Sequence, residues 1–114
     1  MQLFIHITNH VETVAPLLNK LMERGIAGAT VVDCKGMLSA ISESDVEPPP
    51  IFGSLREYLN PKRESGKMVF IALKDEDVPL VKEAVHEVNG CLKAPNTGIL
   101  FTVPIMGWEG VPHK

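Results

Sequence analysis

The sequence predicts an α+β fold, because two segments of the chain repeat the order strand, helix, strand. The first segment covers residues 2–34 and the second covers residues 67–103. The two halves also share sequence, since FIHI at 4–7 matches FIAL at 70–73. A duplicated βαβ unit predicts a ferredoxin-like sandwich, in which a four-stranded antiparallel sheet carries two helices on one face.

The first half is expected to hold a strand over 2–8, a helix over about 10–24 and a strand over 27–34. Asn9 is expected to cap the helix, and Gly25 to end it, because glycine accepts the left-handed conformation of a helix stop. Apolar residues at helical spacing form one stripe: Val14, Leu17, Leu18, Leu21 and Met22.

The second half begins with a nearly unbroken apolar strand over 67–73, which predicts a central place in the sheet. The acidic run 75–77 and Pro79 indicate the start of a helix, where negative charge is favoured, and the pair 89–90 ends it. A last strand is expected over 98–103. The apolar stripe of this helix is Leu80, Val81, Ala84, Val85 and Val88.

A sheet with both helices on one face leaves its other face bare. Because side chains alternate along a strand, the bare face carries either Met68, Phe70 and Ala72 or their alternating neighbours. A bare apolar sheet favours self-association, so the pattern alone predicts an oligomer. In the first strand the two alternating sets are Leu3, Ile5 and Ile7, and Phe4, His6 and Thr8.

Composition narrows the class of protein. The 114 residues are 45% hydrophobic and 22% charged, which predicts one domain over 1–114, and the net charge of −3 argues against nucleic-acid binding. No apolar run approaches the roughly 20 residues of a membrane span, so no membrane insertion is expected. Without a recognisable export signal, and with only Cys34 and Cys91 as cysteines, we expect a reduced, cytoplasmic protein.

A long connection over about 36–66 separates the two halves. It contains three prolines at 48–50, which favour an extended conformation, and a short helix-like stretch over 54–60 that includes Tyr58. Connections this long are often functional. The residues leave two interpretations open: a solvent-exposed spacer, or a loop that responds to a ligand or partner.

The segment GIAGATVVDCKGM over 25–37 resembles the GIxGxTVxExKGF signature of the PII signal-transduction proteins. Asp33 replaces the glutamate and Met37 replaces the aromatic residue. The order of elements, with a long connection in the middle, also matches over about 2–105. The matching residues are Gly25, Ile26, Gly28, Thr30, Val31, Lys35 and Gly36.

This resemblance implies a non-enzymatic, cytoplasmic homotrimer of nitrogen regulation. It implies that a small-molecule effector binds in clefts between subunits, and that the long loop, called the T-loop in this family, engages a partner protein. Some members carry a modified tyrosine in this loop, where Tyr58 lies here. Glycines that admit a ligand to backbone amides, together with hydrogen-bonding side chains, suit such a cleft. The ligand-binding residues expected in this chain are Thr30, Lys35, Gly36, Met37, Asn96, Thr97 and Gly98.

The chain departs from the family where phosphate is bound. Ile99 stands in place of the phosphate-binding lysine, and the terminal pattern with two arginines is replaced by GWEG at 107–110. A triphosphate needs several cationic or amide donors to replace its hydration. The expected ligand is therefore an adenine nucleotide with less charge than ATP, or another small anion.

Catalytic and metal-binding patterns are weak. The histidines are scattered, no nucleophile or phosphate-loop motif is present, and the acidic run 75–77 is explained by the helix start. We therefore expect no catalytic residue, no metal site and no resident cofactor. The alternatives are a metal-handling protein or an enzyme on the same fold, and an adaptor whose loop binds a protein without any ligand. The histidines are His6, His10, His86 and His113.

Overall fold

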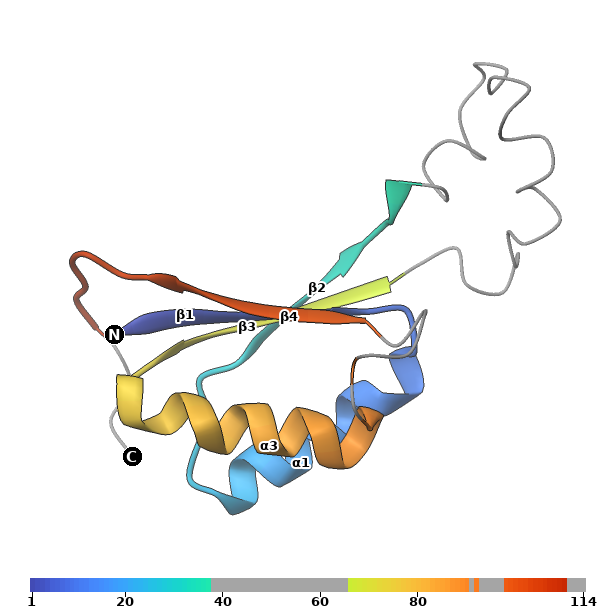
Figure 1. Ribbon diagram of the computed structural model, residues 1–114, viewed down its shortest axis with the longest axis horizontal. Helices are drawn as coiled ribbons and strands as arrows, with labels where there is room; N and C mark the ends of the chain where they lie inside the picture. Colours follow the sequence, from blue (N-terminus) through green and yellow to red (C-terminus); the bar gives the residue numbers. More distant parts are fainter. Residues whose placement is uncertain (38–65, 91, 93–97, 111–114) are drawn as a thin grey trace, which may run out of the picture.

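The computed structural model describes residues 1–37, 66–90, 92 and 98–110 (Figure 1). The predicted helix over 54–60, with Tyr58, lies outside these residues, as does most of the long connection. The elements in chain order are β1 (Gln2–Thr8), η1 (Val11–Thr13), α1 (Val14–Glu23), β2 (Thr30–Cys34), β3 (Gly66–Leu73), η5 (Asp75–Asp77), α3 (Val78–Asn89) and β4 (Ile99–Pro104).

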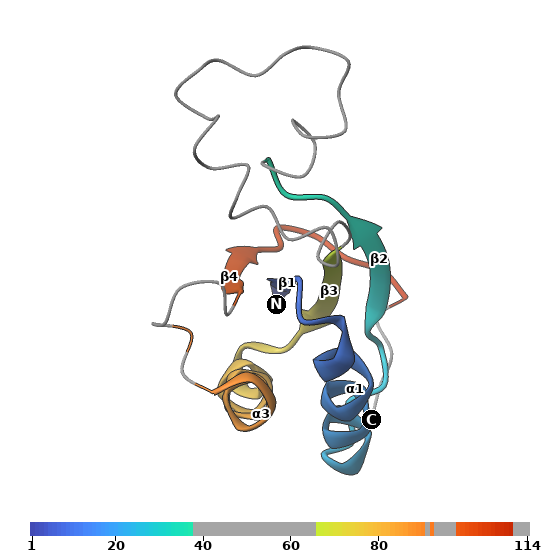
Figure 2. The same cartoon turned by 90° about the vertical axis from the view of Figure 1, so that its right-hand side faces the viewer.

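The four strands form one sheet in the order β2-β3-β1-β4, and every neighbouring pair is antiparallel. The predicted central position of the 67–73 strand is confirmed, since β3 lies between β2 and β1. Figure 2 shows α1 and α3 side by side on the same side of the sheet. The architecture is α+β and is compatible with a ferredoxin-like fold.

The register of the strands assigns each residue to one face. Phe4 is opposite Ile71 and His6 is opposite Val69, and all four side chains are buried on the face that α1 and α3 cover. This face supplies the sheet side of one aliphatic core, as the low aromatic content requires. The core residues are Phe4, Val14, Leu17, Leu21, Ile26, Val69, Ile71, Leu73, Val81, Ala84 and Val85.

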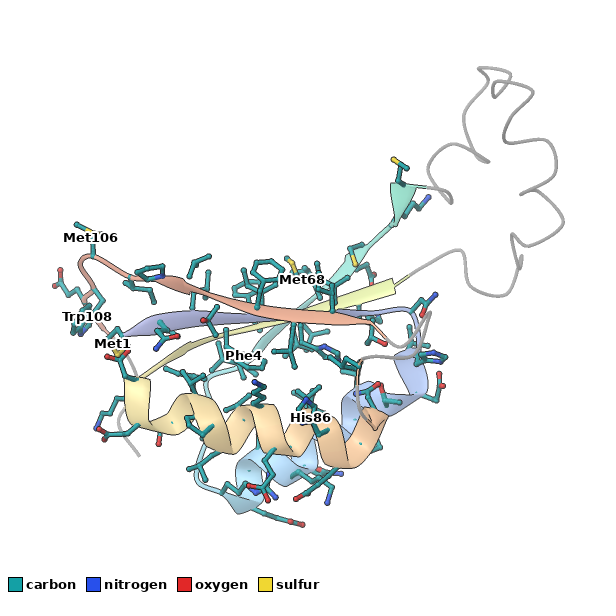
Figure 3. All side chains as sticks on the ribbon, in the orientation of Figure 1. Met1, Phe4, Met68, His86, Met106 and Trp108 are labelled. Carbon is teal, nitrogen blue, oxygen red and sulfur yellow. The ribbon has the colours of Figure 1, made fainter. Side chains whose placement is uncertain are left out.

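The opposite face of the sheet, here called the open face, is covered by neither α1 nor α3 (Figure 3). Ile5 is opposite both Phe70 and Phe101, so this face is apolar across its centre. Of the two sets proposed for β3, the one with Met68, Phe70 and Ala72 lies here. The open face consists of Leu3, Ile5, Ile7, Thr30, Val32, Cys34, Met68, Phe70, Ala72, Ile99, Phe101 and Val103.

The start of α1 differs from the expectation. Asn9 does not cap it, because the 3-10 turn η1 is inserted between the strand and the helix. Hydroxyl groups organise this corner instead: the Thr8 hydroxyl accepts a hydrogen bond from the His10 backbone N–H at 3.0 Å. The Thr13 hydroxyl donates to the His10 carbonyl at 2.6 Å. Two threonine hydroxyls therefore bind the N–H and the carbonyl of His10, and this local arrangement takes the place of the expected asparagine cap.

Two further expectations need correction. β2 begins at Thr30 rather than Ala27, so the chain between Gly25 and Ala29 is a connection rather than a strand. Met22 is 67% exposed and Leu80 is 39% exposed, so each lies at the edge of its apolar stripe rather than in the core.

The predicted helix ends are confirmed. Gly25, after the Arg24 cap of α1, and Gly90, the cap of α3, have φ values of 78° and 75°, a conformation that favours glycine. No helix of the described residues is long and apolar enough to cross a membrane.

Candidate functional site

The first predicted ligand segment begins on β2 and continues beyond its end. Thr30 is exposed on the open face, opposite Phe70. Lys35, Gly36 and Met37 follow the strand and are also exposed, Met37 by 70%. The Lys35 side chain or backbone already takes part in an interaction, so this lysine is not an unused cation.

The second predicted segment is represented by Gly98, because Asn96 and Thr97 lie outside the described residues. Gly98 has a φ of 107° directly before β4. A Cβ atom at this position would lie 2.7 Å from the Ile7 carbonyl oxygen. Glycine is therefore required here both by the backbone conformation and by the close approach of β1.

The sheet order separates the two predicted segments within one chain. The C-terminal end of β2 and the N-terminal end of β4 lie at the same end of the sheet, because β2 is parallel to β1 and β4 is antiparallel to it. However, β2 and β4 are the two edge strands, with β3 and β1 between them. Three strand spacings, roughly 14 Å, therefore lie between these edges. A single chain does not bring Gly36 and Gly98 together.

The described base of the long connection is tightly packed. Lys67 forms an ion pair with Asp33 across the β2–β3 ladder. At Gly66 an added Cβ would lie 3.0 Å from the Thr8 carbonyl oxygen and 3.4 Å from the Cys34 sulfur. The β2–β3 pairing thus continues to Cys34 and Gly66, at the end of the sheet next to the long connection.

His6 is a polar core residue beside Gly98 that the sequence interpretation did not single out as functional. Its side chain is fully buried, and Nδ1 lies 3.1 Å from the Ile99 carbonyl oxygen. Because a carbonyl oxygen only accepts, Nδ1 carries the proton in this contact, which leaves Nε2 as a bare acceptor without a hydrogen-bond partner. Burial lowers the pKa of His6, and the hydrogen bond to Ile99 opposes that effect only in part. The alternation of side chains along β1 could have revealed that His6 is buried, since it places His6 on the same face as Phe4.

A pocket of about 360 Å³ lies at the other end of the sheet, where β3 ends and α3 begins. The sequence interpretation explained its acidic residues as a helix start and attached no role to Trp108. No sequence spacing could reveal it, because its walls come from segments far apart in the chain. Its lining residues are Met1, Gly25, Ile26, Ala27, Gly28, Ile71, Ala72, Leu73, Lys74, Asp75, Glu76, Asp77 and Trp108.

Within the described residues, no three histidine, cysteine or carboxylate side chains are placed to hold a metal ion. Cys34 is a partly buried free thiol, and Cys91 lies outside the described part of the chain.

Comparison with known proteins adds no assignment: no family model matches the chain, and no curated protein matches it. The fold places the protein in the α+β structural class, with a four-stranded antiparallel sheet and two helices.

Proposed function

We propose that this protein is a PII-like, non-enzymatic signalling protein with a ferredoxin-like sandwich fold that works as a homotrimer in the cytoplasm. Its effector is a small molecule bound in clefts between subunits, and its long loop, about 36–66, acts on a partner protein. The observation that carries the proposal is the placement of Gly36 and Gly98 at the same end but on opposite edges of the sheet. A site that uses both segments therefore needs the β2 edge of one copy beside the β4 edge of another.

The open face supports the association of copies. Its central residues, Ile5, Phe70 and Phe101, face away from the helices, and Phe101 and Ile99 are 39% and 53% exposed. A continuous apolar sheet face in water is unfavourable, and burial against further copies removes it from solvent. In a closed ring of copies, sheet edges of neighbouring subunits meet, which is the arrangement that the ligand site requires.

The ligand is proposed to be an adenine nucleotide with less charge than ATP, or another small anion. Gly36 is exposed and an added Cβ there would meet no atom within 4 Å, so a ligand can approach its backbone amide closely. Amide donors of this kind hold small anions well, but among the described residues of the two predicted segments Lys35 is the one cation that could neutralise a triphosphate.

Calorimetric titration with AMP, ADP, ATP, bicarbonate and a cyclic dinucleotide tests the effector, and light scattering coupled to gel filtration measures the assembly. We expect binding of a ligand from this panel to a trimer, and weaker binding by the Lys35→Gln variant. Lys82→Gln is the matched control, because Lys82 is an exposed lysine of α3. A monomeric protein, or a trimer that binds nothing from the panel, would contradict the proposal.

A further inference from the structure

The pocket at the end of β3 is walled by four separate parts of the chain. They are the N-terminal residue, the connection 25–28 between α1 and β2, the segment 71–77 and Trp108. Figure 3 shows Met1 and Trp108 at the same end of the sheet. The backbone N–H of Ile105 donates to the Met1 carbonyl oxygen at 3.1 Å, which holds the chain after β4 beside this end of the sheet.

The size of the pocket suits a small metabolite. Ligand pockets in proteins range over about 300–1,000 Å³, so a volume of about 360 Å³ lies at the small end of that range. A ligand of this size is much smaller than a dinucleotide or a large cofactor. The pocket is also distinct from the proposed effector cleft, because Gly36 and Gly98 lie at the opposite end of the strands.

One part of the wall is apolar. Ile26, Ile71 and Leu73 are buried core residues that also line the pocket. Trp108 lines it as well and remains 57% exposed, so a ligand can still cover much of the indole. An aliphatic floor beside an indole favours an apolar side chain, above all an aromatic one, which gains from contact with the ring.

The pocket wall carries both positive and negative side chains, and two of these charged groups form no ion pair with a described residue. The Asp75 carboxylate is 3.2 Å from the Met1 ammonium group and accepts a hydrogen bond from the Gln2 side chain at 3.1 Å. Asp77 is only 7% exposed and already takes part in an interaction. Among the described residues, no group pairs with the Lys74 ammonium or the Glu76 carboxylate, and both residues are exposed. The pocket therefore presents one free ammonium and one free carboxylate, two positions apart in sequence, next to an apolar wall.

We propose that this pocket binds a free α-amino acid with an apolar side chain. The ammonium group of the ligand pairs with Glu76, its carboxylate pairs with Lys74, and its side chain packs against Ile26, Leu73 and Trp108. Opposite charges held on one small ligand match the two unused charges of the wall. This inference does not rest on trimer formation or on the proposed effector cleft, since every residue of the pocket belongs to one chain.

Titration with L-phenylalanine tests the proposal, with L-leucine as an aliphatic probe. Trp108 is the only tryptophan of the chain, so its fluorescence reports directly on the pocket, and calorimetry measures the affinity independently. Two analogues of the same shape separate the charges: phenethylamine lacks the carboxylate, and 3-phenylpropionate lacks the ammonium group. We expect L-phenylalanine to bind at least about tenfold more tightly than either analogue, because each loses one charge-assisted contact.

The variants Lys74→Gln and Glu76→Gln assign the two charges. Each is expected to weaken L-phenylalanine binding about tenfold. Lys74→Gln should leave phenethylamine binding unchanged, and Glu76→Gln should leave 3-phenylpropionate binding unchanged. Lys82→Gln and Glu83→Gln are the matched controls, since these exposed α3 residues do not line the pocket.

Thermal unfolding by circular dichroism verifies that all four variants fold. Any of three results would overturn the proposal. The first is no response to either amino acid at millimolar concentration, and the second is equal binding by pocket variants and controls. The third is binding of either analogue as tightly as the amino acid. A failure here leaves the nucleotide and anion titrations unaffected, so the two proposals are tested separately.

Discussion

His6 Nδ1 lies 3.1 Å from the Ile99 carbonyl oxygen, so a buried side chain of β1 is hydrogen-bonded to the first residue of β4. Both the neutral Nδ1–H tautomer and the protonated ring can donate this hydrogen bond, but protonation would place a charge in the core and leave the Nε2–H without an acceptor. The edge strand that begins at the proposed effector cleft is thus tied to a titratable group in the core.

Stability is expected to fall in mild acid because of His6. Its pKa in the folded protein is lowered by burial from the ordinary value of 6.5. Above that value the ring is neutral in both states, but below it the unfolded chain takes up a proton that the folded protein resists. The free energy of unfolding should therefore decrease as the pH falls from about 6.5 towards the lowered pKa.

Chemical denaturation at a series of pH values measures this slope. The His6→Leu variant should be less stable at neutral pH, because the Ile99 carbonyl loses its donor, but it should lose the slope. His86→Gln, a change at an exposed α3 position, should retain the slope. An unchanged slope in His6→Leu would show that another group is responsible.

Replacing Gly98 should destabilise the protein, whereas replacing Gly36 should not. Alanine at position 98 would have to adopt a φ of 107° with its Cβ 2.7 Å from the Ile7 carbonyl oxygen. We expect Gly98→Ala to lower the free energy of unfolding by about 1–3 kcal/mol or more. Gly36→Ala is the control, because its Cβ would meet no atom within 4 Å. Equal stability of the two variants in urea unfolding would contradict this account.

The open face is expected to hold the assembly together. Phe101→Glu places a charge on this face and should shift the protein towards monomers in light scattering, because a buried unpaired carboxylate is costly. Leu80→Glu is a closely matched control: both side chains are 39% exposed, but Leu80 lies on α3 rather than on the sheet. A protein whose mass changes equally in both variants does not associate through the open face.

The two helices are joined at their surface by Glu87, which contacts Lys20 at 3.1 Å and Arg24 at 2.8 Å. Hydrogen bonds from these two cations lower the pKa of the Glu87 carboxyl. Stability from this group is therefore present above the ordinary value of 4.5 and is lost as the pH falls through the lowered pKa. Because the site is exposed to solvent, we expect Glu87→Gln to have only a small, salt-sensitive effect on urea unfolding. A large effect that persists in high salt would contradict this view.

Much of the fold could be predicted because its signals are local. The bounds of β1 agree with the structure, and the apolar run of the third strand indicated its central position. The helix start after Thr8 could not be predicted, because an inserted 3-10 turn and two threonine hydroxyls replace the expected Asn9 cap. Local propensity does not distinguish an asparagine cap from side-chain hydrogen bonds of nearby threonines to the backbone.

The candidate sites divide in the same way. Gly98 is selected as a ligand residue through the resemblance to PII proteins, and the structure shows that the close approach of β1 requires a glycine there. The pocket beside Trp108 could not be found, since its walls meet only after the chain has folded. No spacing rule relates residue 108 to residues 25–28 and 74–76.

By itself the sequence determined the α+β class, the order of the elements and the two alternating side-chain sets of each strand. These follow from periodicity, which is a property of neighbouring residues. Only the tertiary structure decided which set faces the helices, that Gly36 and Gly98 lie on opposite sheet edges, and that Lys74 and Glu76 border the same pocket as Trp108. Those relationships depend on strand order and register, which are set by contacts between distant parts of the chain.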